Sequence, residues 1–147
     1  LMKRVNCQKV KEAIQTKWPK LTVKFEEDPT EQGFIIGLGD DYTTIYVCLN
    51  ETEQKRSQKD VFLFISTGND EIKDTTVYKN SFDLDPIKTD EENIIGMITE
   101  SLETYSREDY RFYKPLLDDL ERMNVPDMME GEHVFQKIEE LTGITYL

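Results

Sequence analysis

Residues Val61–Ser66, with the sequence VFLFIS, contain the longest unbroken run of apolar residues in the chain. Aromatic and β-branched residues favour strands, and five apolar residues bounded by polar segments are typical of a buried strand. The run is far shorter than the ~20 residues that a membrane-spanning helix needs. The stretch therefore predicts a strand at the centre of a sheet.

Neighbouring stretches alternate apolar and polar residues, the period of a strand with one buried face. In residues 44–49, Ile45, Val47 and Leu49 fall on one face and the intervening residues on the other. Polar segments such as Gly39-Asp40-Asp41 and the solvated loop of residues 50–60 separate successive strands, and parallel pairing would need a crossover of a dozen or more residues. The pattern predicts an antiparallel meander, with further strands over residues 21–25, 34–38 and 75–80.

The ends of the chain have the period of helices instead. Cys7, Val10, Ile14 and Trp18 recur at spacings of three and four, which predicts an amphipathic helix that Pro19 ends. A basic first helix beside an acidic remainder is expected to be neutralised within the fold, since residues 1–24 carry seven basic residues against Glu12.

After Pro86, three helices are predicted. Thr89–Glu92 has the pattern of a capping box and begins the first of them. Ser106–Asp109 has a weaker version of that pattern and predicts a second start, with Pro115 kinking or interrupting the helix that follows. A last helix carries Val134, Ile138 and Leu141, and Gly143 suits the left-handed position beyond its end.

These elements predict the fold class. We expect residues 2–147 to form a single α+β domain. It would have an N-terminal helix, a four- to five-stranded antiparallel meander sheet and three C-terminal helices packed on one face of that sheet.

Composition excludes several classes of function. The chain has 30 acidic and 18 basic residues, for a net charge of −12. Such a surface repels phosphate backbones and anionic lipids, so we expect neither nucleic acid nor membrane as a partner. Charges recur from Lys3 to Lys24 where a secretory signal would need an apolar stretch, and we therefore expect a cytoplasmic protein. Cys7 and Cys48 are expected to be free thiols there, although a bridge between them stays open.

The familiar catalytic and metal-binding motifs are missing or fail. His133 is the single histidine, too few for a histidine-rich zinc site, and it is expected to lie on the surface among carboxylates. Gly37-Leu38-Gly39-Asp40 lacks the third glycine, lysine and following helix of nucleotide-binding loops. Asp83–Ile94 begins like a calcium loop but departs from it at positions five, six and twelve. We predict no catalytic residue, no metal and no cofactor.

The first functional hypothesis is a small acidic, non-enzymatic protein-binding module, such as an inhibitor or immunity-type protein, that binds a partner with a basic surface. Opposite charges would steer the two proteins together. The acidic side chains expected to contact the partner lie on the predicted C-terminal helices: Asp118, Asp119, Glu121, Glu139 and Glu140.

Two alternatives remain open. One is a small-ligand-binding or enzymatic domain, its site on the uncovered sheet face or between the sheet and the C-terminal helices, with Tyr46, Tyr78 and Tyr110 as polar contacts. The other is a homo-oligomer that pairs through an exposed sheet edge.

Overall fold

The computed structural model describes residues 4–38, 43–50, 59–67, 75–122 and 137–145. The chain divides into two compact units, Leu1–Ile98 and Thr99–Leu147. The first unit holds the whole sheet, the N-terminal helix and the start of the long helix that follows the sheet.

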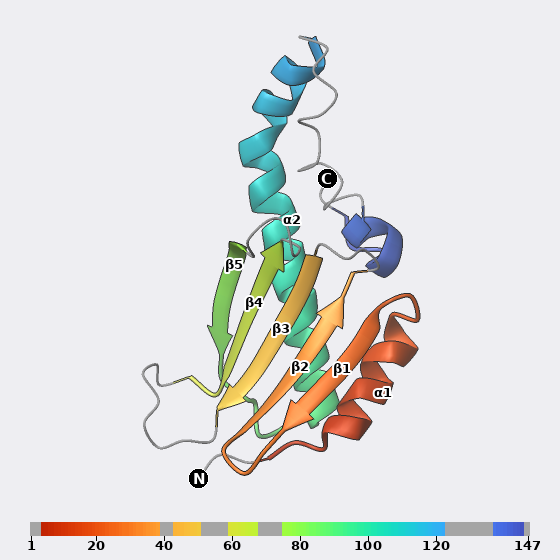
Figure 1. The fold of residues 1–147 in the computed structure, drawn as a ribbon, viewed down its shortest axis with the longest axis vertical. Helices are drawn as coiled ribbons and strands as arrows, with labels where there is room; N and C mark the ends of the chain where they lie inside the picture. The colour runs from red at the N-terminus through yellow and green to blue at the C-terminus, as the bar shows by residue number, and fades with distance from the viewer. Residues whose placement is uncertain (1–3, 39–42, 51–58, 68–74, 123–136, 146–147) are drawn as a thin grey trace. The chain divides into compact units, whose positions relative to one another are not determined.

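Five strands form one antiparallel sheet in the order of the sequence, as the meander predicted (Figure 1). They are β1 (Thr22–Glu27), β2 (Glu31–Gly37), β3 (Thr43–Asn50), β4 (Val61–Thr67) and β5 (Thr75–Phe82). The prediction that residues 61–66 lie at the centre needs correction, because β3 is the middle strand and β4 lies between β3 and β5. The turn expected at residues 39–41 lies outside the described residues.

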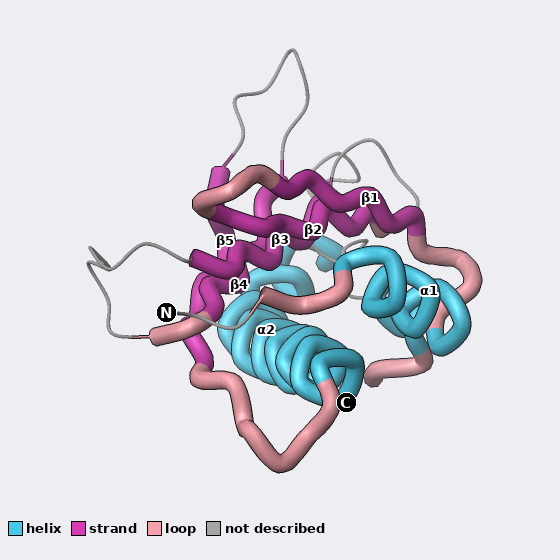
Figure 2. The backbone as a smooth tube through the Cα atoms, turned by 90° about the horizontal axis from the view of Figure 1, so that it is seen from below, coloured by secondary structure: helices cyan, strands magenta, loops and turns pink. Residues whose placement is uncertain are grey.

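One face of the sheet forms the core of the first unit. Directly opposed pairs such as Ile36 with Ile45 and Val47 with Leu63 are almost fully buried on this face. The helix α1 (Cys7–Lys17) and residues 90–98 of the next helix lie on the same side of the sheet (Figure 2). The predicted alternation in residues 44–49 is confirmed, since Ile45, Val47 and Leu49 are the buried members.

The helix α1 confirms its predicted stripe, because Cys7, Val10, Ile14 and Trp18 are all buried. Its N-cap is Asn6, whose side-chain oxygen accepts a hydrogen bond of 3.1 Å from the backbone N–H of Lys9. This bond satisfies one of the amide groups that a helix start leaves without an intrahelical partner.

A single helix, α2 (Asp90–Arg122), replaces the first two of the three predicted C-terminal helices. Thr89 caps its start as predicted, accepting a hydrogen bond of 3.2 Å from the N–H of Glu92. The predicted second start was wrong, because Ser106 is fully buried within a continuous helix. Residues that can cap a helix do not break one, and adding a residue to an existing helix costs far less than nucleating a new one.

Pro115 lies inside α2 and does not end it. A proline there removes one backbone hydrogen bond, but the helix continues on both sides. Residues 137–142 are also helical, and Gly143 follows them with the predicted positive φ of 75°. His133, which was expected near the start of this last helix, lies outside the described residues. Among the described residues no helix is long and apolar enough to cross a membrane.

Candidate functional site

The face of the sheet turned away from α1 carries a second set of apolar side chains. One row across the strands reads Lys24, Ile35, Tyr46, Phe64 and Lys79, each residue directly opposite the next. The rings of Tyr46 and Phe64 are stacked, with centroids 4.8 Å apart and an interplanar angle of 18°. We call this side of the sheet, turned away from α1, the open face. All five residues of the VFLFI run are apolar because alternate residues point to the covered face and to the open face.

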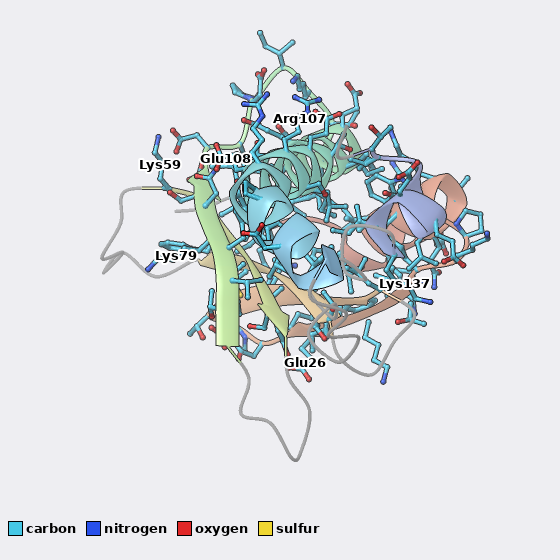
Figure 3. All side chains as sticks on the ribbon, turned by 90° about the horizontal axis from the view of Figure 1, so that it is seen from above. Glu26, Lys59, Lys79, Arg107, Glu108 and Lys137 are labelled. Carbon is cyan, nitrogen blue, oxygen red and sulfur yellow. The ribbon has the colours of Figure 1, made fainter. Side chains whose placement is uncertain are left out.

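The neighbouring row on the open face contains a hollow. Gly33 of β2 lies opposite Glu26 of β1 on one side and Cys48 of β3 on the other, and Phe62 of β4 comes next. Because Gly33 has no side chain, a gap remains in an otherwise filled row. Glu26 lies on the side of the sheet away from α1 (Figure 3).

A cavity of about 420 Å³ opens over this hollow. Its lining divides into two kinds of residue. Acidic residues from the end of β1, the following turn and the start of β2 form an acidic rim: Glu26, Glu27, Asp28 and Glu31. Of these, Glu27 is directly opposite the buried Gln32 and directs its carboxylate to the α1 side of the sheet. The other part is mostly apolar and includes Gly33, Ile35, Tyr46 and Cys48. The cavity thus combines negative charge with apolar surface in a single small space.

Two of the four rim carboxylates already have partners within the protein. Asp28 accepts hydrogen bonds of 2.8–2.9 Å from Thr30 and from the N–H of Glu31, which closes the turn between β1 and β2. Glu27 accepts a hydrogen bond of 2.9 Å from the side-chain amide of Gln32, and its carboxylate lies 3.6 Å from the guanidinium of Arg4. These contacts position the rim.

The other two carboxylates, Glu26 and Glu31, form no side-chain hydrogen bond or ion pair within the described part of the chain. Both residues are exposed. They occupy diagonal positions on neighbouring strands, since Glu26 is opposite Gly33 and Glu31 precedes Gly33 by two residues. Diagonal pairs of this kind have Cβ atoms about 7 Å apart. The site therefore holds two carboxylates that are free to bind a cation from outside.

Because Glu27 and Asp28 are hydrogen-bonded in the folded protein, the stability that they contribute depends on pH. The Gln32 amide, and after it the neighbouring Cys7 thiol and Arg4, hold the pKa of Glu27 below its ordinary value of 4.5. The backbone N–H and hydroxyl of Thr30 hold the pKa of Asp28 below 3.8. A depressed pKa in the folded state means that stability is fully present above the ordinary value and is lost as the pH falls through the depressed one.

We therefore expect acid to weaken the fold as the pH falls below the ordinary pKa of 4.5 for Glu27 and then below that of 3.8 for Asp28. The midpoint of urea unfolding, measured over this range, should decline less steeply for Glu27→Gln and Asp28→Asn than for the unchanged protein. A matched control is Glu100→Gln, at an exposed position on α2, which should leave the slope unaltered. Equal slopes for all variants would show that the rim contacts do not contribute to stability.

Cys48 lines the cavity as a protonated thiol. Burial, and after it the charge of Glu31, raises its pKa, so the thiolate is disfavoured at neutral pH. A thiol with a raised pKa is a poor nucleophile. The chemistry that this site offers is thus charge and apolar contact, and Cys48 contributes surface to it.

Gln32 ties the rim to the N-terminal segment. Its side chain is 2% exposed. It accepts a hydrogen bond of 3.0 Å from the N–H of Val5 and donates one of 2.8 Å to the carbonyl of the same residue. Its amide nitrogen also lies 3.3 Å from the sulfur of Cys7. Burial, and after it the charge of Glu27, raises the pKa of Cys7 to about 11. Both cysteines are free, as predicted.

The acidic residues predicted to contact a partner belong to helical segments and not to the sheet. Asp118, Asp119 and Glu121 belong to α2, where Asp119 is exposed, and Glu139 and Glu140 are exposed in the helical residues 137–142. Adjacent residues on a helix point in different directions, so Glu139 and Glu140 do not share one face. These acids lie on two separate helical segments.

Of the three tyrosines suggested for a ligand pocket, Tyr46 and Tyr78 lie on opposite faces of the sheet. Tyr46 lies on the open face, whereas Tyr78 is opposite Ile65 and so lies on the covered face. Tyr110 belongs to α2. Only Tyr46 lines the cavity over Gly33.

The segment that begins like a calcium loop forms a turn before α2. Asp83 forms an ion pair of 3.0 Å with Lys59, and Asp85 accepts a hydrogen bond of 3.0 Å from the N–H of Ile87. Asn93 of α2 bonds both the N–H and the carbonyl of Asp85 at 3.0 Å. These acidic residues thus anchor the connection from β5 to α2.

Sequence reasoning missed the cavity because its key residue is a glycine within a strand. An isolated glycine in a strand pattern is the available signal, since it can mark a place where another group approaches the backbone. Comparisons with protein-family models, curated proteins and solved structures found no match for this chain.

Proposed function

We propose that this protein is a non-enzymatic protein-binding module, of the inhibitor or immunity type, that binds a partner with a basic surface. The observation that carries the proposal is the acid-rimmed cavity on the open face of the sheet, where Glu26 and Glu31 have no side-chain partner among the residues that the structure describes. A net charge of −12 would steer a basic partner toward it. Free thiols are consistent with an encounter in the cytoplasm.

The open face also offers apolar surface for the core of an interface. Phe62 is 37% exposed, and Tyr46 and Phe64 beside it are half-buried. Interfaces commonly combine aromatic residues at the centre with charge at the rim. Here the aromatic rows lie in β3 and β4 and the carboxylates at the β1–β2 end, which gives a partner both kinds of contact.

Three double variants used as bait in a native lysate test this proposal. Glu26→Gln with Glu31→Gln removes the free rim charges, and Glu139→Gln with Glu140→Gln removes helix acids proposed from the sequence. Glu100→Gln with Glu108→Gln is the control, because both side chains are exposed on α2 and belong to neither set. We expect a basic protein that the unchanged bait and the control retain, and that the Glu26 and Glu31 variant loses.

The recovered protein must then show electrostatic steering. Its association rate constant should fall about tenfold between low and physiological salt, because exposed charges are screened. A rate constant that does not depend on salt would contradict the proposal. If instead the variant at Glu139 and Glu140 fails to retain the partner, the binding site lies on the helices and not on the sheet.

A further inference from the structure

We infer that the cavity over Gly33 is a receptor for one arginine side chain of the basic partner. This inference rests on the proposed function and names the group that the partner inserts. The observations that carry it are the two-part lining, the two unengaged carboxylates and the hollow that Gly33 leaves.

The lining selects a long side chain with an apolar stem and a cationic end. Ile35 and Cys48 give apolar surface along the floor, while the carboxylates gather at the rim. Lysine and arginine place their methylene groups against apolar surface and keep the charge at a polar edge. A metal ion would not use the apolar part, and an apolar ligand would leave the carboxylates unused.

The positions of the two free carboxylates favour arginine over lysine. Glu26 and Glu31 are diagonal neighbours on two strands, on either side of the gap at Gly33. A guanidinium has five N–H donors directed along its plane, so one group can donate to two carboxylates at once. An ammonium group is a compact point charge that is more strongly hydrated.

An aromatic ring in the lining adds to this preference. Tyr46 is held by its stack against Phe64, which fixes the ring where the cavity meets the aromatic row. Guanidinium groups stack on aromatic rings, and they lose less hydration on doing so than ammonium groups.

Gly33 has no steric need to be glycine in this fold, so the hollow can be filled by substitution without disturbing the backbone. Its backbone does not have a positive φ, and a Cβ added there would meet its nearest heavy atom, the carbonyl oxygen of Val47, at an ordinary 3.6 Å. Glycine within a strand weakens the strand. A larger residue at this position should therefore fold well and fill the cavity.

The test uses the full chain, labelled with ¹⁵N, and three small probes: the N-acetyl methylamides of arginine, lysine and citrulline. Citrulline has nearly the shape of arginine without the charge. We expect the arginine probe to shift the amide signals of Gly33 and Cys48 in a saturable way. Its binding should be about tenfold or more tighter than that of citrulline, since charge-assisted hydrogen bonds are lost, and measurably tighter than that of lysine.

Two variants separate the roles of space and charge. Gly33→Val should keep the melting temperature or raise it and should abolish the saturable shift. Glu26→Gln with Glu31→Gln should retain the hollow but lose the preference for arginine over citrulline. Glu100→Gln with Glu108→Gln, the control, should bind the arginine probe within twofold of the unchanged protein.

Several results would overturn the inference. They are no saturable shift with arginine, equal binding of arginine and citrulline, or undiminished binding by a folded Gly33→Val protein. Equal binding of lysine and arginine would overturn the arginine assignment and leave a basic partner in place. Failure of every probe, together with a recovered basic partner that depends on Glu26 and Glu31, would also overturn this inference while the proposed function stands.

Discussion

Leu63→Ala is expected to lower the free energy of unfolding by about 3–4 kcal/mol. Leu63 is 1% exposed in β4 and faces the core of the first unit, directly opposite Val47 of the middle strand. Removing its side chain loses buried apolar surface and leaves a gap between closely packed neighbours. Urea unfolding at neutral pH, followed by circular dichroism, measures the change.

The neighbouring Phe62 provides the matched control, because it has a larger side chain on the same strand and the opposite face. It is 37% exposed. Phe62→Ala should cost about 1 kcal/mol, mostly through lost strand propensity and partial burial. If Phe62→Ala destabilised the protein as much as Leu63→Ala, the open face would not be open, and the cavity over Gly33 would be covered.

Gln32→Leu should lower the free energy of unfolding by about 2–4 kcal/mol, because two buried backbone groups of Val5 lose their partners at once. Leucine has a similar volume, so lost hydrogen bonds and not a cavity dominate the change. Chemical unfolding gives the free energy, and hydrogen exchange at the Val5 amide reports on the local attachment of the N-terminal segment.

Gln8→Leu is the control for this second change. Gln8 is exposed on α1 and makes one side-chain bond of 3.0 Å to Glu12, so its replacement should cost less than about 0.5 kcal/mol. A stable Gln32→Leu protein with a protected Val5 amide would show that other contacts hold the N-terminal segment to the sheet.

Local patterns predicted the strands because the alternation of apolar and polar residues involves only a few neighbouring residues. The alternation of Ile45, Val47 and Leu49 with polar residues was enough to assign both faces of β3. The stripe of Cys7, Val10 and Ile14 likewise gave α1 its buried face. Such patterns carry over into the structure because burial follows the period of the element.

The helical C-terminal region was harder to predict because local signals there conflict. Ser106 begins a pattern that is common at helix starts, and Pro115 is a residue that usually ends a helix. Both nevertheless lie inside α2. A helix that has already formed can include an unfavourable residue when its apolar positions are buried, and Ile94, Ile98 and Leu102 are fully buried.

The candidate site could not be predicted because it depends on the register of three strands. Glu26, Gly33 and Cys48 are adjacent only when β1, β2 and β3 are aligned as the structure has them. A shift of one residue would move Gly33 to the other face. Sequence adjacency drew attention instead to paired acids on helices, such as Glu139 and Glu140, whose side chains diverge.

Binding of an arginine side chain over Gly33 can be followed in the amide spectrum of the ¹⁵N-labelled protein during addition of N-acetyl-arginine methylamide. We expect saturable shifts at Gly33 and Cys48 and none at Glu100, Glu108, Glu139 or Glu140. Shifts centred on the helical acids, or no saturable shift at any residue, would contradict this expectation.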